Sequence, residues 1–122
     1  MHLKQMYYIC TTMNKNNLYK GCLEALVLQL IANEGPLYGY EITQKAKLLS
    51  NNQMTITEGT LYPLLHKLEA EGVLESYVED FNNRPRKYYK IAQNGDGKVQ
   101  DNKAQLQEFI QNLQAFLNPK LA

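Results

Sequence analysis

Four leucines at helical spacing mark the segment around which the rest of the chain is organised. They fall at positions i, i+3, i+4 and i+7, and they are Leu61, Leu64, Leu65 and Leu68. This spacing is typical of one apolar face of an amphipathic helix. The side opposite the leucines lacks the usual coat of Glu and Lys and carries small, aromatic and basic residues. The pattern therefore predicts a helix whose outer side lies against another molecule.

Capping residues mark the two ends of this helix. Three threonines are candidate N-caps: Thr55, Thr57 and Thr60. Gly72 stands where a left-handed residue would end the helix. In a helix interior, Pro63 would clash with the carbonyl oxygen four residues earlier. We therefore expect the regular helix to begin close to Thr60, with Pro63 still in its first turn.

Two more helices are expected before this one. The first covers residues 18–33 and ends at Gly35-Pro36. Its apolar stripe consists of Leu23, Leu26, Val27, Leu30 and Ile31, and a second apolar side carries Ala25 and Leu28. A helix that is apolar on more than one side is buried on more than one side. The second helix covers residues 38–49, and its expected inward residues are Tyr38, Ile42, Ala46 and Leu49.

After Gly72 the period changes from helical to alternating. Residues 73–80 and 86–92 are rich in Val, Tyr and Ile, and the turn-forming residues 81–85 separate them, so we expect a β-hairpin. Three helices followed by a hairpin is the order of elements in a winged helix-turn-helix. The predicted fold class is thus mainly α with a small β-hairpin (α+β). The winged helix-turn-helix domain would cover residues 18–92, after an N-terminal tail over residues 1–17.

The last segment, residues 93–122, returns to a helical period and is expected to be a dimerisation helix. An a/d heptad pattern runs through it at Val99, Asn102, Leu106, Phe109, Leu113 and Phe116, and Ile110 and Leu117 widen the stripe. So long a stripe exceeds what the core of a small domain can cover, so a second copy of the chain is the expected partner. We expect Ala25 and Leu28 of the first helix to complete the interface, and Asn102 to pair with its symmetry mate.

Composition narrows the possible functions. The 122 residues suit one domain, and the net charge of +1 does not by itself indicate a nucleic-acid-binding protein. Cys10 and Cys22 form no CxxC motif, and two free thiols fit a reducing cytoplasm. No apolar run has the length of a membrane span. His2 and His66 are the only histidines, and neither belongs to a nucleophile or metal constellation, so we expect neither an enzyme nor a cofactor.

The outer side of the central helix supplies candidate DNA contacts. They are Glu58, Gly59, Thr60, Tyr62, Pro63, His66 and Lys67. An α-helix fits the major groove, where hydroxyl and imidazole groups can bind base edges. Gly59 would allow close backbone approach, and Lys67 is better placed for a phosphate. Two alternatives stay open: Tyr62 could pack on the hairpin, and His66 could be an ordinary exposed histidine.

The expected hairpin tip carries the clearest local charge. Four basic residues without an acid among them lie within seven positions: Arg84, Arg86, Lys87 and Lys90. Beside a recognition helix, such a tip would meet the sugar–phosphate backbone. Tyr38 and Tyr40 lie in the turn at the N-terminus of the second helix; we expect one of them in the core and the other to offer its hydroxyl to a phosphate.

Four motifs in colinear order resemble the PadR family of bacterial transcriptional regulators. They are LYKG at 18–21, GPLYGYEI at 35–42, EGTLYPLLHKLE at 58–69 and RPRKYY at 84–89. The resemblance implies a repressor that dimerises through its C-terminal helix, binds inverted-repeat operators in double-stranded DNA and, as family members often do, responds to small aromatic or cationic compounds, so a small aromatic effector is expected. The chain contains no Trp, which some family members use to stack a flat ligand, so the effector pocket does not carry over. The alternative reading is a winged-helix protein-interaction module without DNA binding, against which the basic tip argues.

Overall fold

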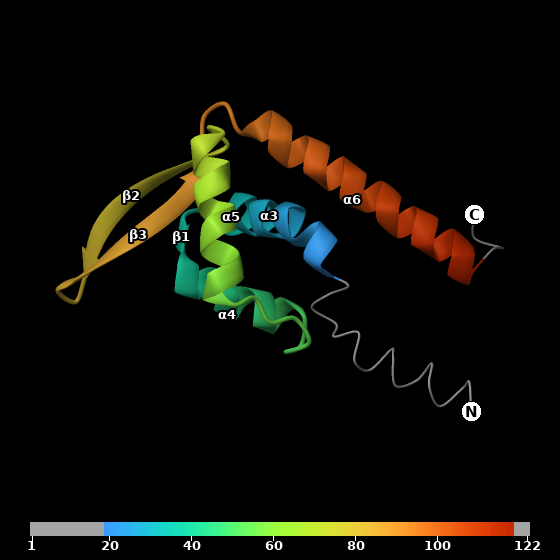
Figure 1. Cartoon of the computed structure of the whole chain (residues 1–122), viewed down its shortest axis with the longest axis horizontal. Coiled ribbons are helices and arrows are strands. Elements are labelled where there is room, and N and C mark those ends of the chain that lie inside the picture. The colour runs from blue at the N-terminus through green and yellow to red at the C-terminus, as the bar shows by residue number, and fades with distance from the viewer. Residues whose placement is uncertain (1–18, 119–122) are drawn as a thin grey trace.

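The computed structural model describes residues 19–118 (Figure 1). Its elements in chain order are η1 (Lys20–Cys22), α3 (Leu23–Glu34), β1 (Leu37–Tyr38), α4 (Gly39–Leu49), α5 (Glu58–Ala70), β2 (Leu74–Phe81), β3 (Arg84–Ile91) and α6 (Asp96–Leu117). The three strands form one antiparallel sheet in the order β1-β3-β2. The predicted fold class is confirmed, with β1 as a short strand that the sequence did not predict. The expected tail, residues 1–17, lies outside the described residues.

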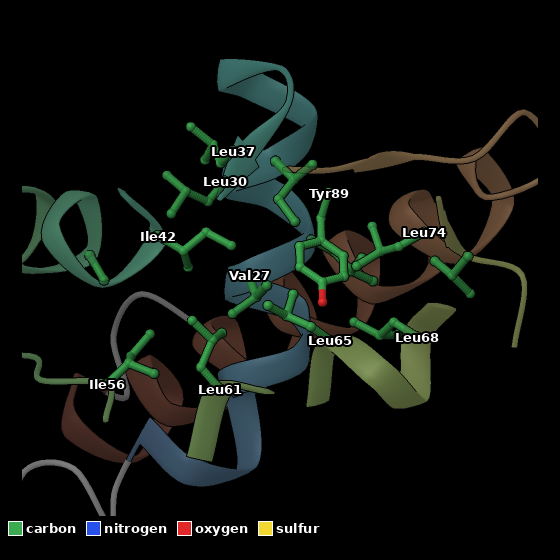
Figure 2. Close-up of a cluster of buried hydrophobic side chains, with 14 of the residues drawn as sticks. Val27, Leu30, Leu37, Ile42, Ile56, Leu61, Leu65, Leu68, Leu74 and Tyr89 are labelled. Atoms are coloured by element: carbon green, nitrogen blue, oxygen red, sulfur yellow. The ribbon is translucent and has the colours of Figure 1, made fainter. Parts of the chain in front are cut away.

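The leucine stripe of α5 lies at the centre of the core. Leu61, Leu65 and Leu68 are completely buried, and Leu64 packs against the same cluster at its edge. The ring of Tyr89, from the middle strand β3, lies among these leucines (Figure 2). The face predicted from the period is therefore the face that the core covers.

Both ends of α5 are fixed by hydrogen bonds. The Thr60 N–H donates to the Thr57 hydroxyl at 3.3 Å, so Thr57 is the N-cap and the helix begins at Glu58. Thr57 is thus the one of the three candidate N-caps that is used, and the helix begins two residues before Thr60. The expectation that Pro63 lies in the first turn is wrong, because the earlier start places it in the second. At the other end Gly72 has a φ of 79°, and the Val73 N–H donates to the Leu68 carbonyl at 2.9 Å, as in a Schellman motif. The predicted left-handed glycine is confirmed.

Helix α3 is buried on more than one side, as its apolar pattern predicted. Leu28 has an exposed fraction of 0%, because α6 and β3 pack on α3 in addition to α4. The expectation that Leu28 lies on an exposed side is therefore wrong, and Leu28 cannot contact a partner chain directly. Leu49, expected to point inward, is 74% exposed because the last turn of α4 extends past the core.

The hairpin turn has two residues rather than the expected five. Asn82 and Asn83 have φ angles of 53° and 64°, which is the type I′ turn that matches the twist of the flanking strands. Arg84 therefore begins β3 opposite Phe81, and Pro85 lies within the strand opposite Asp80. The turn fixes the register, and with it the acidic residues that face the basic ones.

The first turns of α6 pack on the core, and the rest of the helix extends away from it (Figure 1). At its start, a Cβ on Gly95 would collide with the Val73 carbonyl oxygen, so glycine is needed there. Gln29 Nε2 of α3 donates to the Val99 carbonyl at 2.9 Å. Val99 and Asn102 are buried against their own chain, so they are not part of the exposed stretch of α6, and the pairing of Asn102 with a symmetry mate stays a prediction. The exposed apolar part of α6 comprises Phe109, Ile110, Leu113, Phe116 and Leu117.

Within residues 19–118, none of the helices combines the length and the hydropathy that crossing a membrane would require.

Replacing Leu65 by Ala should lower the free energy of unfolding by about 2–5 kcal/mol, because the change leaves a cavity in the core. Leu49→Ala removes the same atoms from an exposed side chain and should change the free energy by less than about 0.5 kcal/mol. Urea denaturation of both variants measures the difference. Equal losses would contradict the described packing.

Candidate nucleic-acid interface

The side of α5 opposite the leucines gathers most of the predicted contact residues. Six of them are exposed on this helix: Glu58, Gly59, Thr60, Pro63, His66 and Lys67. The buried residues of α5 are Leu61, Leu65 and Leu68, and they hold the helix against the core. This surface is thus free over the first turns, and a protruding helix of this kind has the dimensions that the major groove admits.

Thr60 keeps a hydrogen-bond donor for a ligand. The Thr57 hydroxyl donates to the Thr60 hydroxyl oxygen at 3.0 Å. Because the Thr60 oxygen accepts this bond, the hydrogen of its own hydroxyl is left to point outward. The N-cap therefore also orients the side chain that follows it.

Tyr62 is half-buried and packs against the start of α4. A Cβ built on Gly39 would lie 2.6 Å from the Tyr62 hydroxyl oxygen, so the glycine makes room for the ring. Tyr62 thus packs against the start of α4, and Tyr89 of the hairpin is also close enough to raise its pKa. Burial raises the pKa of Tyr62, and the nearby Glu58 carboxylate adds to the shift, so the hydroxyl stays protonated and can donate.

Arg86 joins the wing to the tyrosines before α4. Its Nη1 donates to the Tyr38 hydroxyl at 3.0 Å, and its guanidinium lies 4.5 Å from the Tyr38 ring centroid and 4.6 Å from that of Phe81. Tyr40 stacks beside Tyr38, with ring centroids 6.5 Å apart. Tyr38 is half-buried and Tyr40 is exposed, so the expectation that one of them lies in the core is wrong. Leu37 occupies that core position instead.

Most of the basic side chains at the interface have acidic partners. Lys87 lies 3.4 Å from Glu69, and Lys90 lies 3.8 Å from Glu75. Lys67 of α5 lies 3.7 Å from Glu24 of α3. The basic cluster is therefore less positive than its sequence suggested, and sequence reasoning missed these acids. Prediction of a two-residue turn at Asn82-Asn83 would have shown one of these pairs, since that turn places Glu75 opposite Lys90.

Arg84 differs from these lysines. It is exposed beside the turn, and no acidic side chain of residues 19–118 forms an ion pair with it. It is the wing residue whose charge is most available to an anion.

Glu69 links α5 to both long strands, β2 and β3. Its carboxylate accepts a hydrogen bond from the Ser76 hydroxyl of β2 and pairs with Lys87 of β3. The Ser76 hydrogen bond, with the Lys87 charge as a smaller contribution, lowers the pKa of Glu69 from its ordinary value of 4.5. The wing is thereby held at a fixed angle to α5.

In the part of the chain that the structure describes, no three His, Cys, Asp or Glu side chains come together as a metal site would need.

The order α3, short strand β1, α4, α5 and the two-stranded wing β2-β3 defines a winged helix-turn-helix protein. Residues 27–101 match the transcriptional regulator PadR-like family. The chain belongs to this family of transcriptional regulators, as its sequence motifs predicted.

Individual relatives agree with this assignment. Uncharacterised protein X of Lysinibacillus sphaericus is 38% identical over 84 residues, which cover 68% of this chain and 76% of that protein. Transcriptional regulator Rv3488 of Mycobacterium tuberculosis is 30% identical over 82 residues, 67% of this chain and 74% of the relative. The crystal structure of a PadR family transcriptional regulator from Eggerthella lenta superposes with a TM-score of 0.74 at 28% identity, covering 93% of this chain and 97% of the other.

The lowered pKa of Glu69 predicts a pH dependence. A carboxylate whose folded-state pKa lies below its unfolded value stabilises the fold above that unfolded value, and the contribution is lost as the pH falls through the folded pKa. Ser76→Ala should therefore raise the Glu69 pKa towards 4.5 and flatten the acid part of the stability profile. Carboxyl NMR titration and denaturation at several pH values measure both effects.

Lys87→Met is the matched comparison, because it removes the smaller contribution and leaves the hydrogen bond in place. It should shift the Glu69 pKa less than Ser76→Ala does. The reverse order would show that the ion pair, and not the hydroxyl, dominates.

Proposed function

We propose that this regulator is a bacterial DNA-binding repressor that acts in the cytoplasm as a homodimer on an inverted-repeat operator, and that it is not an enzyme. The observation that carries the proposal is the division of α5: one face is completely buried, while six candidate contact residues lie together on the other. The wing beside that helix supports the same assignment, since its Arg84 forms no ion pair within residues 19–118.

The side chains divide into base-reading and phosphate-binding groups. Thr60, Tyr62 and His66 offer donors or acceptors to base edges, and Glu58 can accept from a cytosine amino group. Gly59 and Pro63 present little bulk, which permits close approach of the helix. The phosphate-binding group comprises Lys67, Arg84, Arg86 and Lys87, with the Tyr38 and Tyr40 hydroxyls beside it.

The paired lysines do not prevent this role. Exposed ion pairs contribute between about 0 and 1 kcal/mol, and Lys67, Lys87 and Lys90 all have side chains that are 45% exposed or more. Phosphates can therefore replace Glu24 and Glu69 as partners at small cost. Each neutralised phosphate also releases counterions, which favours binding at low salt.

The exposed half of α6 supplies the proposed dimer seam. It consists of Phe109, Ile110, Leu113, Phe116 and Leu117, and Ala25 and Leu106 lie half-buried near its beginning. We assign residues 18–92 to DNA binding and residues 93–122 to dimerisation. Two-fold pairing through α6 would present two copies of α5 to successive major grooves, about 34 Å apart, which requires an inverted repeat.

A protein-interaction module without DNA binding remains the second candidate. The wing exposes Val78 and Phe81, and apolar side chains at a wing suit a protein partner better than a phosphate backbone. The two functions differ in their dependence on salt, because DNA binding weakens steeply as salt rises.

The experiment compares two variants in DNA-binding titrations over a range of salt. Arg84→Ala should weaken binding to operator and random duplex alike, and it should lower the salt-dependence slope by about one, because one phosphate contact is lost. Thr60→Val keeps the shape of the side chain but removes its donor. It should reduce discrimination at one operator position by about 1 kcal/mol and leave the slope unchanged. The operator itself comes from selection of bound fragments.

Lys98→Ala serves as the charge control, since Lys98 is an exposed lysine on α6 outside the proposed surface. It should leave both affinity and slope near the wild-type values. If the wild-type protein binds no duplex DNA at low salt, that result would contradict the proposed function and favour the protein-interaction module.

Phe109→Asp should convert the dimer to monomers, because it would bury an unpaired charge in the seam. The monomer should keep weak half-site binding and lose tight binding to the full operator. Gln111→Asp adds the same charge at an exposed position on another side of α6 and should leave the dimer intact. Sedimentation of both variants provides the test, and a persistent Phe109→Asp dimer would place the seam elsewhere.

A further inference from the structure

The outer side of β2 is a strand edge without a neighbour. In the sheet order β1-β3-β2, strand β2 pairs with β3 on one side, and within residues 19–118 no strand pairs with its other side. Figure 1 shows that the far half of the hairpin projects beyond the helices. An edge of this kind presents backbone donors and acceptors that a further strand can use.

The turn decides which backbone groups of β2 face outward. In a hairpin closed by a two-residue turn, the residues that flank the turn are a hydrogen-bonded pair, and hydrogen-bonded and non-hydrogen-bonded pairs then alternate along the ladder. Phe81 and Arg84 flank the turn and lie opposite each other. Three residues of β2 therefore direct their N–H and C=O groups to the free side: Ser76, Val78 and Asp80.

The side chains of β2 make this edge acidic. The strand contains no basic residue and three acids, which are Glu75, Glu79 and Asp80. Glu75 pairs with Lys90 of β3, whereas Glu79 and Asp80 form no ion pair within residues 19–118. These carboxylates repel phosphate groups, so the edge suits a positively charged partner and not DNA.

Apolar side chains lie exposed beside the acids. Val78 is 66% exposed, Phe81 51% and Tyr77 38%. Side chains alternate between the two faces of a strand, so Val78 lies on one face and the two aromatic rings lie on the other. A strand added to the edge would therefore cover apolar surface on both faces.

Strand β3 shows which side chains complement those of β2. It places a basic residue opposite Glu75, a tyrosine opposite Tyr77 and a basic residue opposite Glu79. The two tyrosine rings stack, with centroids 5.5 Å apart. Because the three β2 side chains share one face, they are also neighbours of any strand on the free side. A strand that repeats this order of cation, aromatic residue and cation at alternate positions is complementary to them.

We propose that the free edge of β2 binds an extended segment of a partner protein that carries basic residues on either side of an aromatic residue, at alternate positions. The segment adds a fourth strand to the sheet, held by hydrogen bonds to the backbone of Ser76, Val78 and Asp80. Glu75 and Glu79 attract its basic side chains. A second copy of β2 is a poor occupant, because two acidic strands would bring like charges together. This inference goes beyond the proposed function and does not depend on DNA binding, so its test uses the full chain without DNA.

The first test is calorimetry with an acetylated and amidated heptapeptide, Thr-Lys-Val-Tyr-Val-Lys-Thr, which has the stated pattern. In antiparallel register its tyrosine lies opposite Tyr77, and its two lysines lie opposite Glu75 and Glu79. Replacing both lysines of the peptide by glutamate should weaken binding at least about tenfold, because two attractions become repulsions. No binding of the lysine peptide, or equal binding of the two peptides, would overturn the proposal.

N-methylation separates strand pairing from simple charge attraction. In the same register, the backbone N–H groups of the two valines point towards β2, and those of the two lysines point to solvent. Methyl groups on the valine nitrogens should weaken binding at least about tenfold, because two hydrogen bonds are lost. Methyl groups on the lysine nitrogens should leave the affinity within about twofold. Equal effects of the two modifications would contradict pairing with β2.

Variants of the protein locate the binding edge. Val78→Pro removes an outward N–H and no hydrogen bond of the hairpin, and it should weaken the lysine peptide at least about tenfold. Glu79→Lys should weaken the lysine peptide and strengthen the glutamate peptide. Glu108→Lys makes the same change at an exposed position on α6 and should leave both affinities as they are. Thermal melts confirm that the variants fold. Wild-type affinities in folded Val78→Pro or in Glu79→Lys would overturn the proposal.

Hydrogen exchange provides a direct readout of the added strand. In the complex, the amides of Ser76 and Val78 should exchange at least about tenfold more slowly, while the Tyr77 amide, which faces β3, should change little. Protection at α6 in place of β2 would show that the peptide binds elsewhere. If the free wild-type protein forms assemblies that Val78→Pro dissociates in sedimentation, a second copy occupies the edge, and the proposed partner is ruled out.

Discussion

The enclosure of α3 is the constraint on which the arrangement of the other elements depends. Val27, Leu28 and Ile31 have almost no exposed surface, because α4, β3 and α6 each contact this helix. α6, which carries the candidate dimer seam, packs directly on α3, while α5, which carries the candidate DNA surface, packs on α4 and β2. Residues of α3 and α5 nevertheless share one hydrophobic core.

The junction before α6 adds a second fixed point. Gly95 touches the Val73 carbonyl, and the Ala92 N–H donates to the same carbonyl oxygen at 2.9 Å. Because only glycine fits there, the direction in which α6 leaves the sheet is set by backbone contacts rather than by a side-chain cap. The direction of α6 determines the spacing of the two recognition helices in any two-fold dimer.

The sequence predicted the faces of helices well and their neighbours less well. The period of Leu61, Leu65 and Leu68 identified the buried side of α5, since the period depends only on the helix itself. The same reasoning failed at Leu28, which is completely buried in its own chain, because a period shows which residues share a face but not whether the same chain or a second copy covers it. The helix start was missed because Thr57 and Thr60 are equivalent in sequence, and only the hydrogen-bond geometry distinguishes them.

The sequence predicted which residues belong to the candidate site, but it did not predict the ion pairs that those residues form. Lys67 and Lys87 were expected on the DNA-facing surface, while their partners Glu24 and Glu69 were not, because those pairs join segments that are far apart in sequence. In the sequence, the four basic residues of the hairpin lie within seven positions with no acid among them. Strand register and helix packing, which depend on the turn at Asn82-Asn83, decide which acids they meet.

Pro85 has a consequence for the solubility of the wing. Among the described residues, strand β3 has no neighbour on that side beyond the two residues of β1, and open strand edges invite pairing between molecules. A proline offers no N–H to such an edge, and the charged residues Arg84 and Arg86 flank Pro85. The open edge of β3 is thus accompanied by residues that discourage aggregation through it.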